Sequence, residues 1–188
     1  MLKKIFTFIA LLICSLCFAD GFNCEALENP PASIRHEIKR ATGSHFWYSN
    51  PLHSYQLQEY KCEVAFFSRI IQKTNGTRLC QIVFENNKAE IKEIHIKFKD
   101  GKIVSIPKKN AGVYKDEKGV EHYYFTGELP VQQYINYFVK DMPQFVLASI
   151  PKLFNGKIEL PIQKEWLQAF SNMKILFVIS NEVQIRFQ

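Results

Sequence analysis

Two groups of side chains in this sequence are suited to binding another molecule. The first lies in residues 45–60, where aromatic residues stand beside histidines, and the second is a run in which His95 and two lysines alternate with apolar residues. Aromatic rings with polar edges anchor partners, and lysines attract anionic polymers or lipid headgroups. The candidate contact residues from the two groups are His45, Trp47, Tyr48, His53, Lys97 and Lys99.

Each group also has a purely structural explanation. The aromatic segment can cover one end of a sheet, in which case its rings belong to the core. The lysines can form the solvated side of an amphipathic sheet, where they bind nothing. Substitution of Trp47 and Tyr48 by Ala separates the two explanations, because loss of core residues lowers the melting temperature and loss of contact residues does not.

No complete catalytic or metal-binding motif accompanies these groups. His36-Glu37 begins a zinc-binding helix pattern, but the second histidine would have to be residue 40, which is arginine. The sequence has no Gly-x-Ser-x-Gly elbow and no phosphate-binding glycine loop. A cysteine nucleophile would need a histidine beside it, and no pattern here indicates one. We therefore expect no cofactor and no metal, and the sequence favours a non-enzymatic protein.

The first 19 residues predict export. Lys3 and Lys4 precede an apolar run from Ile5 to Leu16, and the small residue Ala19 ends the segment. A membrane-spanning helix needs about 20 apolar residues, so the run is too short for a permanent anchor. We place cleavage after Ala19. Residues 20–188 then form a single exported domain, periplasmic or secreted, with no transmembrane span, and the signal favours a bacterial source.

Composition limits the class of protein and its partners. The chain is 47% hydrophobic with only 8 Gly and 8 Pro, which favours a folded domain over a disordered chain. Removal of Lys3 and Lys4 lowers the net charge from +6 to +4, because all 18 acidic residues remain. This charge is too small to indicate nucleic-acid binding. We expect a macromolecular partner, either a protein or an envelope polysaccharide.

Three cysteines remain after cleavage, Cys24, Cys62 and Cys80. Outside the cytosol we expect one disulfide and one odd thiol, and three pairings are open. A tight hairpin around Asn75-Gly76 would set Cys80 opposite residue 71, far along the ladder from Cys62. This geometry favours a disulfide that involves Cys24.

Strands dominate the middle of the chain. In residues 60–71, both the even-numbered and the odd-numbered positions carry apolar side chains, which favours a central strand with two covered faces. A helix is the alternative, because the same segment also has an apolar face at helical spacing. Residues 79–85 are strand-like. Asp100-Gly101 joins two alternating runs into a predicted hairpin, and residues 113–125 predict another.

Helices are expected on both sides of these strands. Residues 20–56 look irregular apart from a short helix that begins near Ser33 and ends at Arg40. A clear apolar stripe predicts a helix between Pro130 and Pro143, followed by a second helix over residues 144–154. A third helix begins at Pro161, with an apolar face that includes Trp166 and Phe170.

The end of the chain returns to strands, over residues 175–179 and 183–187. Strands, helices and strands in this order predict an α+β fold with a mostly antiparallel sheet of about six to eight strands and two or three helices packed on one face. We predict an exported, non-enzymatic protein that binds another macromolecule of the cell envelope or exterior. The alternatives are an inhibitor of an extracellular hydrolase such as lysozyme, and a small secreted hydrolase.

Overall fold

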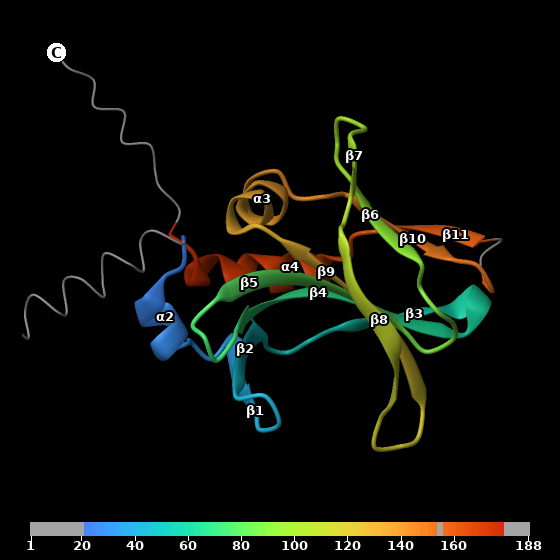
Figure 1. Ribbon diagram of the computed structural model, residues 1–188. Helices are drawn as coiled ribbons and strands as arrows, with labels where there is room; N and C mark the ends of the chain where they lie inside the picture. The colour runs from blue at the N-terminus through green and yellow to red at the C-terminus, as the bar shows by residue number, and fades with distance from the viewer. Residues whose placement is uncertain (1–20, 154–155, 179–188) are drawn as a thin grey trace, which may run out of the picture.

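Two antiparallel sheets make up most of the α+β fold (Figure 1). The computed structural model describes residues 21–153 and 156–178. The larger sheet has the strand order β1-β2-β4-β5-β9-β8, with β3 also paired to β4, and the smaller sheet has the order β11-β10-β6-β7. The strands of the larger sheet are β1 (Ile34–Lys39), β2 (Ser44–Ser49), β3 (Ser54–Leu57), β4 (Cys62–Gln72), β5 (Arg78–Asn86), β8 (Lys108–Lys115) and β9 (Glu121–Leu129). Those of the smaller sheet are β6 (Glu93–Lys97), β7 (Ile103–Ser105), β10 (Phe145–Ile150) and β11 (Gly156–Pro161).

The helices are short and cover one face of the larger sheet. Figure 1 shows α3 and α4 on the same side of β4 and β5, and α4 contacts both β4 and β2. The predicted packing of helices on one face is therefore confirmed. The helical elements are α2 (Cys24–Glu28), η1 (Gln58–Tyr60), α3 (Val131–Tyr134), the π-helical η2 (Ile135–Lys140), α4 (Lys164–Met173) and η3 (Lys174–Leu176).

The core lies between β4 and these helices. Phe66 points from β4 into a cluster of rings, with its centroid 5.4 Å from Phe170, 5.9 Å from Trp166 and 6.3 Å from Phe138. Trp166 and Phe170 are one helical turn apart on α4 and are both almost fully buried, as the apolar stripe predicts. Edge-to-face and offset contacts of this kind add to the stabilisation from burial.

Several predicted strands are confirmed. Residues 60–71 fall largely in β4 and not in a helix, and β4 pairs with β5 over nine residue pairs. Asp100-Gly101 joins β6 to β7, and β8 and β9 form the predicted hairpin over residues 113–125. In β6, Ile94 and Ile96 are fully buried while His95 between them is only partly buried, which confirms the alternation.

The register of the β4–β5 hairpin differs by one residue from the prediction. Cys80 lies opposite Ile70, not residue 71. The turn is longer than two residues, because the Gly76 N–H bonds to the Lys73 carbonyl at 2.9 Å and Gly76 has a φ of 82°. A left-handed glycine after a turn is typical of a three-residue hairpin loop with a bulge, which adds one residue to the loop.

Two predicted helices are strands instead. Residues 33–40 fall mainly in β1, where His36 stacks on Trp47 of β2, so pairing along the β1–β2 hairpin replaces the helix. Residues 144–154 contain β10, in which every second residue is buried between β6 and β11. With β1, β2 and β11 added, the described residues hold eleven strands, more than the six to eight expected. In both cases strand pairing overrides a local helical pattern, through the neighbouring β2 for β1 and through β11 and the distant β6 for β10.

The predictions for the two ends of the chain are only partly covered by the structure. The leader over residues 1–19 and the strand over residues 183–187 lie outside the described residues. Ile175 and Leu176 belong to η3 and not to a strand, and Phe177 forms a single β-bridge with Phe22.

Candidate functional site

The larger sheet has one face that no described helix covers, and a groove runs across it. Two adjoining clefts of about 690 Å³ and 660 Å³ lie on this face. We call the two clefts together the open-face groove. The residues that line both clefts are Lys39, Phe46, Arg69, Glu85 and Tyr114.

Six adjacent strands build the groove. Side chains of β4 and β5 form its floor, while the β1–β2 and β8–β9 hairpins project on either side of it, away from α3 and α4 (Figure 1). Because neighbouring strands lie about 4.8 Å apart, the six strands that contribute to the groove span roughly 24 Å. The groove is therefore wide enough for an extended ligand.

Arg69 is the central cation of the groove. It is half-buried on β4, its Nε donates a hydrogen bond to Oε1 of Gln81 at 3.0 Å, and its guanidinium lies 5.2 Å from the centroid of the Phe46 ring. Burial lowers the pKa of Arg69, and the nearby charge of Glu85 acts in the opposite direction. The guanidinium is thus fixed from two sides.

A chain of polar contacts extends from Arg69 across the floor. The Gln81 Nε2 donates to Oε1 of Glu128 at 3.0 Å, and Oε2 of Glu128 lies 3.5 Å from the ammonium of Lys109. This chain crosses from β4 through β5 to β9 and β8. It fixes the amide orientation of Gln81, because the oxygen accepts from Arg69 and the nitrogen donates to Glu128.

Glu85 is the acid of the floor. The Tyr114 hydroxyl donates to Oε2 of Glu85 at 3.2 Å. Burial raises the pKa of Glu85, although the hydrogen bond from Tyr114 and the charge of Arg69 partly offset this effect. Burial and the charge of Glu85 in turn raise the pKa of Tyr114 to about 12, so this phenol stays protonated at neutral pH.

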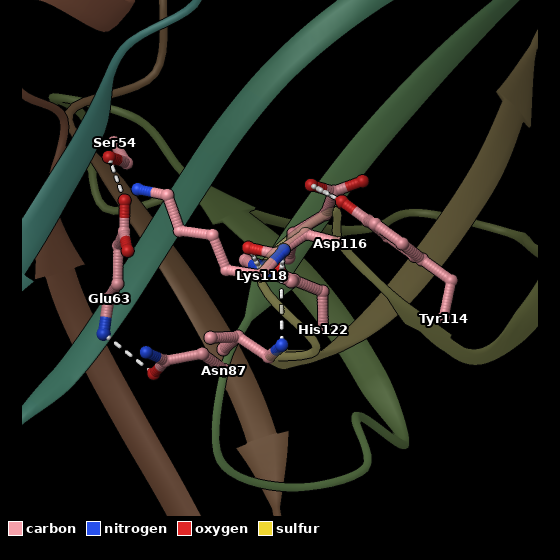
Figure 2. A network of polar contacts seen from close by, with 9 residues as sticks. Ser54, Glu63, Asn87, Tyr114, Asp116, Lys118 and His122 are labelled. Carbon is pink, nitrogen blue, oxygen red and sulfur yellow. Dashed lines mark hydrogen bonds and ion pairs between the residues drawn. The ribbon is translucent and has the colours of Figure 1, made fainter.

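The β8–β9 hairpin adds a histidine and a second acid beside this pair. The Tyr114 ring stacks on His122 with centroids 5.2 Å apart, and Nε2 of His122 lies 3.3 Å from Oδ2 of Asp116. Figure 2 draws these side chains together with Glu63 of β4, which accepts a hydrogen bond from the Ser54 hydroxyl. Of these side chains, only Tyr114 lines the groove, and His122, Asp116 and Glu63 lie outside the linings of the two clefts.

Of the sequence-predicted aromatic candidates, only Tyr48 reaches the groove. It lines the larger cleft, and burial and Glu37 raise its pKa to about 12. Trp47 is 3% exposed, and its indole N–H donates to the Leu27 carbonyl at 2.9 Å. Trp47 is therefore a core residue, which is the structural explanation given above for the aromatic segment. His45 lies on the same side as Trp47, with ring centroids 5.7 Å apart, and the carbonyl of His53 accepts from Trp166.

The second predicted group, which contains His95 and Lys97, lies on the smaller sheet. The Lys97 ammonium is 2.8 Å from Oε1 of Glu159 and 5.2 Å from the centroid of the Phe145 ring. His95 lies 3.4 Å from Glu93, so acids from β6 and β11 partly neutralise this surface. Lys99 is in the exposed loop between β6 and β7. The structure therefore does not bring the two predicted groups together.

The cysteines do not pair as expected among themselves. Cys62 and Cys80 are free and buried, so none of the three pairings considered for Cys24, Cys62 and Cys80 is present. Burial raises the pKa of both thiols, which opposes a nucleophilic role. A disulfide in the exported protein remains a prediction.

Sequence reasoning missed the floor of the groove. Arg69 and Glu85 lie within apolar strands, and Tyr114 and Tyr124 lie within a hairpin, so the sequence patterns do not single them out. A usable signal is present, since an arginine inside the apolar run of β4 and a glutamate at the end of β5 are unusual positions for charges.

Comparisons with known proteins add no relative. No family model, no curated protein and no solved structure matches the chain. Within residues 21–153 and 156–178, no helix has the length and apolar character to cross a membrane. The same residues contain no group of three or more His, Cys, Asp or Glu side chains suited to a metal ion.

Proposed function

We propose that this protein is an exported, non-enzymatic binding protein that holds another macromolecule of the cell envelope or exterior in the open-face groove. The export part rests on the leader in the sequence. The binding part rests on one observation, the groove on a sheet face that no described helix covers. A sheet in a folded domain normally buries one face and solvates the other with polar residues, whereas this face carries aromatic and charged side chains together.

Exposed apolar residues at both sides of the groove support a contact role. Ile38 is 55% exposed and Leu52 40% exposed on the β1–β2 side, while Val113 is 52% and Tyr114 44% exposed on the β8 side. Apolar side chains that gather around a groove mark interaction surfaces more often than isolated ones do. A ligand that spans the groove would bury residues on both sides.

The proposal is tested by removing exposed apolar surface from the groove. The variant Leu52→Ala/Tyr114→Ala should lose capture of envelope or extracellular polymers by the immobilised protein, with little change in melting temperature. Ile103→Ala is the matched control, because Ile103 is 54% exposed on β7 of the other sheet. Equal capture by the groove variant and wild type would contradict the proposal.

A small secreted hydrolase is the second candidate, and Glu85 favours it. A carboxyl group with a raised pKa in a groove is the kind of group that serves as a general acid in glycoside hydrolysis. Hydrolysis of a glycan substrate that is abolished in Glu85→Gln would establish this candidate. Binding without turnover, retained in Glu85→Gln, supports the non-enzymatic protein.

A further inference from the structure

We infer that the ligand of the open-face groove is an acidic polysaccharide, whose uronate carboxylate is bound by the guanidinium of Arg69. This inference rests on the proposed function and names its ligand class. It is carried by three features of the groove: the free donors of Arg69, the excess of positive charge around it, and the mixture of aromatic and amide side chains beside it.

Arg69 presents hydrogen-bond donors to the groove. A guanidinium has five N–H donors, and among the described residues only the one on Nε has an acceptor, Gln81. The remaining donors form the fork that matches a carboxylate in bidentate geometry. The Phe46 ring below and the Gln81 amide beside it hold this fork in place, which lowers the ordering cost of binding.

The charges around Arg69 favour an anion. In the part of the chain that the structure describes, no carboxylate lies within ion-pair distance of Arg69, Lys39 or Lys73, all of which line the groove. The acids of the groove already have partners. Glu37 pairs with Arg35 at 2.6 Å, and Glu128 contacts Lys109. Glu85 accepts a hydrogen bond from the Tyr114 hydroxyl at 3.2 Å. Glu85 is the acid whose charge acts on Arg69, but the two side chains form no ion pair. A half-buried guanidinium in this setting gains more from an incoming anion than a fully solvated one.

The other side chains favour a saccharide over a peptide. The backbone groups of β4, β5 and β9 are paired on both sides, so the groove floor has no free strand edge for an added peptide strand. It offers instead the rings of Tyr114 and Tyr124 and the exposed amide of Asn110. A pyranose ring has an apolar C–H face and a rim of hydroxyl groups, which match rings and amides respectively.

The test measures binding of hexagalacturonate to the full exported protein by calorimetry. Arg69→Gln should weaken binding by about tenfold or more, because the charge-assisted contacts are lost. Arg69→Lys should rescue only part of the loss, because an ammonium lacks the planar fork. Lys97→Gln on the smaller sheet is the matched control and should bind as wild type, and all variants are checked for an unchanged melting temperature.

Two further ligands separate the carboxylate from general attraction. The methyl-esterified hexagalacturonate should bind at least about tenfold more weakly than the free acid, and hexaglutamate should bind more weakly than the uronate. Equal binding of the methyl ester, equal binding of hexaglutamate, an Arg69→Gln variant like wild type, or no binding of hexagalacturonate would each overturn the inference. Loss of another ligand in Leu52→Ala/Tyr114→Ala but not in Arg69→Gln would overturn it while the proposed function stands.

Discussion

The two faces of β4 differ in what their residues do, although the residues alternate along one strand. On the helix-covered face, Phe66 and Ile70 are fully buried, and Ser68 between them shares a hydrogen bond with Tyr134 at 2.7 Å. On the open face, Arg69 carries a charge towards the groove and Phe67 lies beside it. The alternation of side chains along β4 therefore places core residues on one face and groove residues on the other within eleven residues.

The difference between the two faces explains how the charged side chain of Arg69 is tolerated in the middle of an apolar strand. The covered face supplies the burial that stabilises the sheet, so the open face can hold Arg69 and Glu85 at a cost that the core offsets. Residues on the covered face should therefore dominate the free energy of unfolding, and residues on the open face should dominate binding. The predictions that follow test this division.

The largest expected effect is the difference in free energy of unfolding between alanine variants of two neighbouring phenylalanines. Phe66→Ala should lower the free energy of unfolding by about 3–5 kcal/mol, because it leaves a cavity between β4 and the helices. Phe67→Ala should lower it by less, because the ring borders the groove and not the closed core. Urea unfolding of both variants measures the difference, and equal losses would contradict the division between the faces.

The hydrogen bond between Ser68 and Tyr134 gives the next effect. Both side chains are buried, so Tyr134→Phe should leave the Ser68 hydroxyl without this partner and lower the free energy of unfolding by about 1–3 kcal/mol. The double variant Ser68→Ala/Tyr134→Phe should lose less than the sum of the single variants. Additive losses from the same urea experiments would show that the two hydroxyl groups are not coupled.

Glu85 gives a pH-dependent effect on the open face. Burial raises the pKa of Glu85 in the folded protein, so the folded state binds the proton more tightly than the unfolded state. The free energy of unfolding of the wild type therefore falls as the pH rises above the ordinary glutamate range and Glu85 loses its proton. Glu85→Gln removes this titration. The variant should therefore gain in free energy of unfolding relative to wild type between pH 4 and pH 7, and a relative loss over this range would contradict the direction of the shift.

The smallest effect is expected at the exposed end of the polar chain. Lys109 is 55% exposed and lies 3.5 Å from Glu128. Exposed ion pairs contribute little, so Lys109→Ala should change the free energy of unfolding by less than about 0.5–1 kcal/mol. A loss as large as that of Tyr134→Phe would mean that the open face also carries stability.

The sequence predicted the strands and helices whose periodicity is strong, and it failed where pairing with another strand decides the structure. The stripe of Trp166 and Phe170 and the alternation of Ile94 and Ile96 both appear in the structure. Residues 33–40 and 144–154 become strands because β2, β6 and β11 pair with them, which no local pattern reveals.

The groove could not be predicted, because it depends on which strands are neighbours. Arg69, Glu85 and Tyr114 come together through the pairing of β4 with β5, β5 with β9 and β9 with β8. In the sequence they are separated by segments of other strands. Tyr48 is a contact residue predicted from its aromatic surroundings, and it lines the groove, whereas its neighbour Trp47 alternates to the buried face.

The central claim is that ligand binds on the open face of the larger sheet, and chemical-shift mapping tests it most directly. Hexagalacturonate is titrated into ¹⁵N-labelled protein, and the backbone amide and arginine Nε–H signals are followed. We expect the largest changes in β2, β4, β5 and β9, with the Arg69 Nε–H signal among them. Changes confined to β6, β7, β10 and β11, or no changes at all, would contradict it.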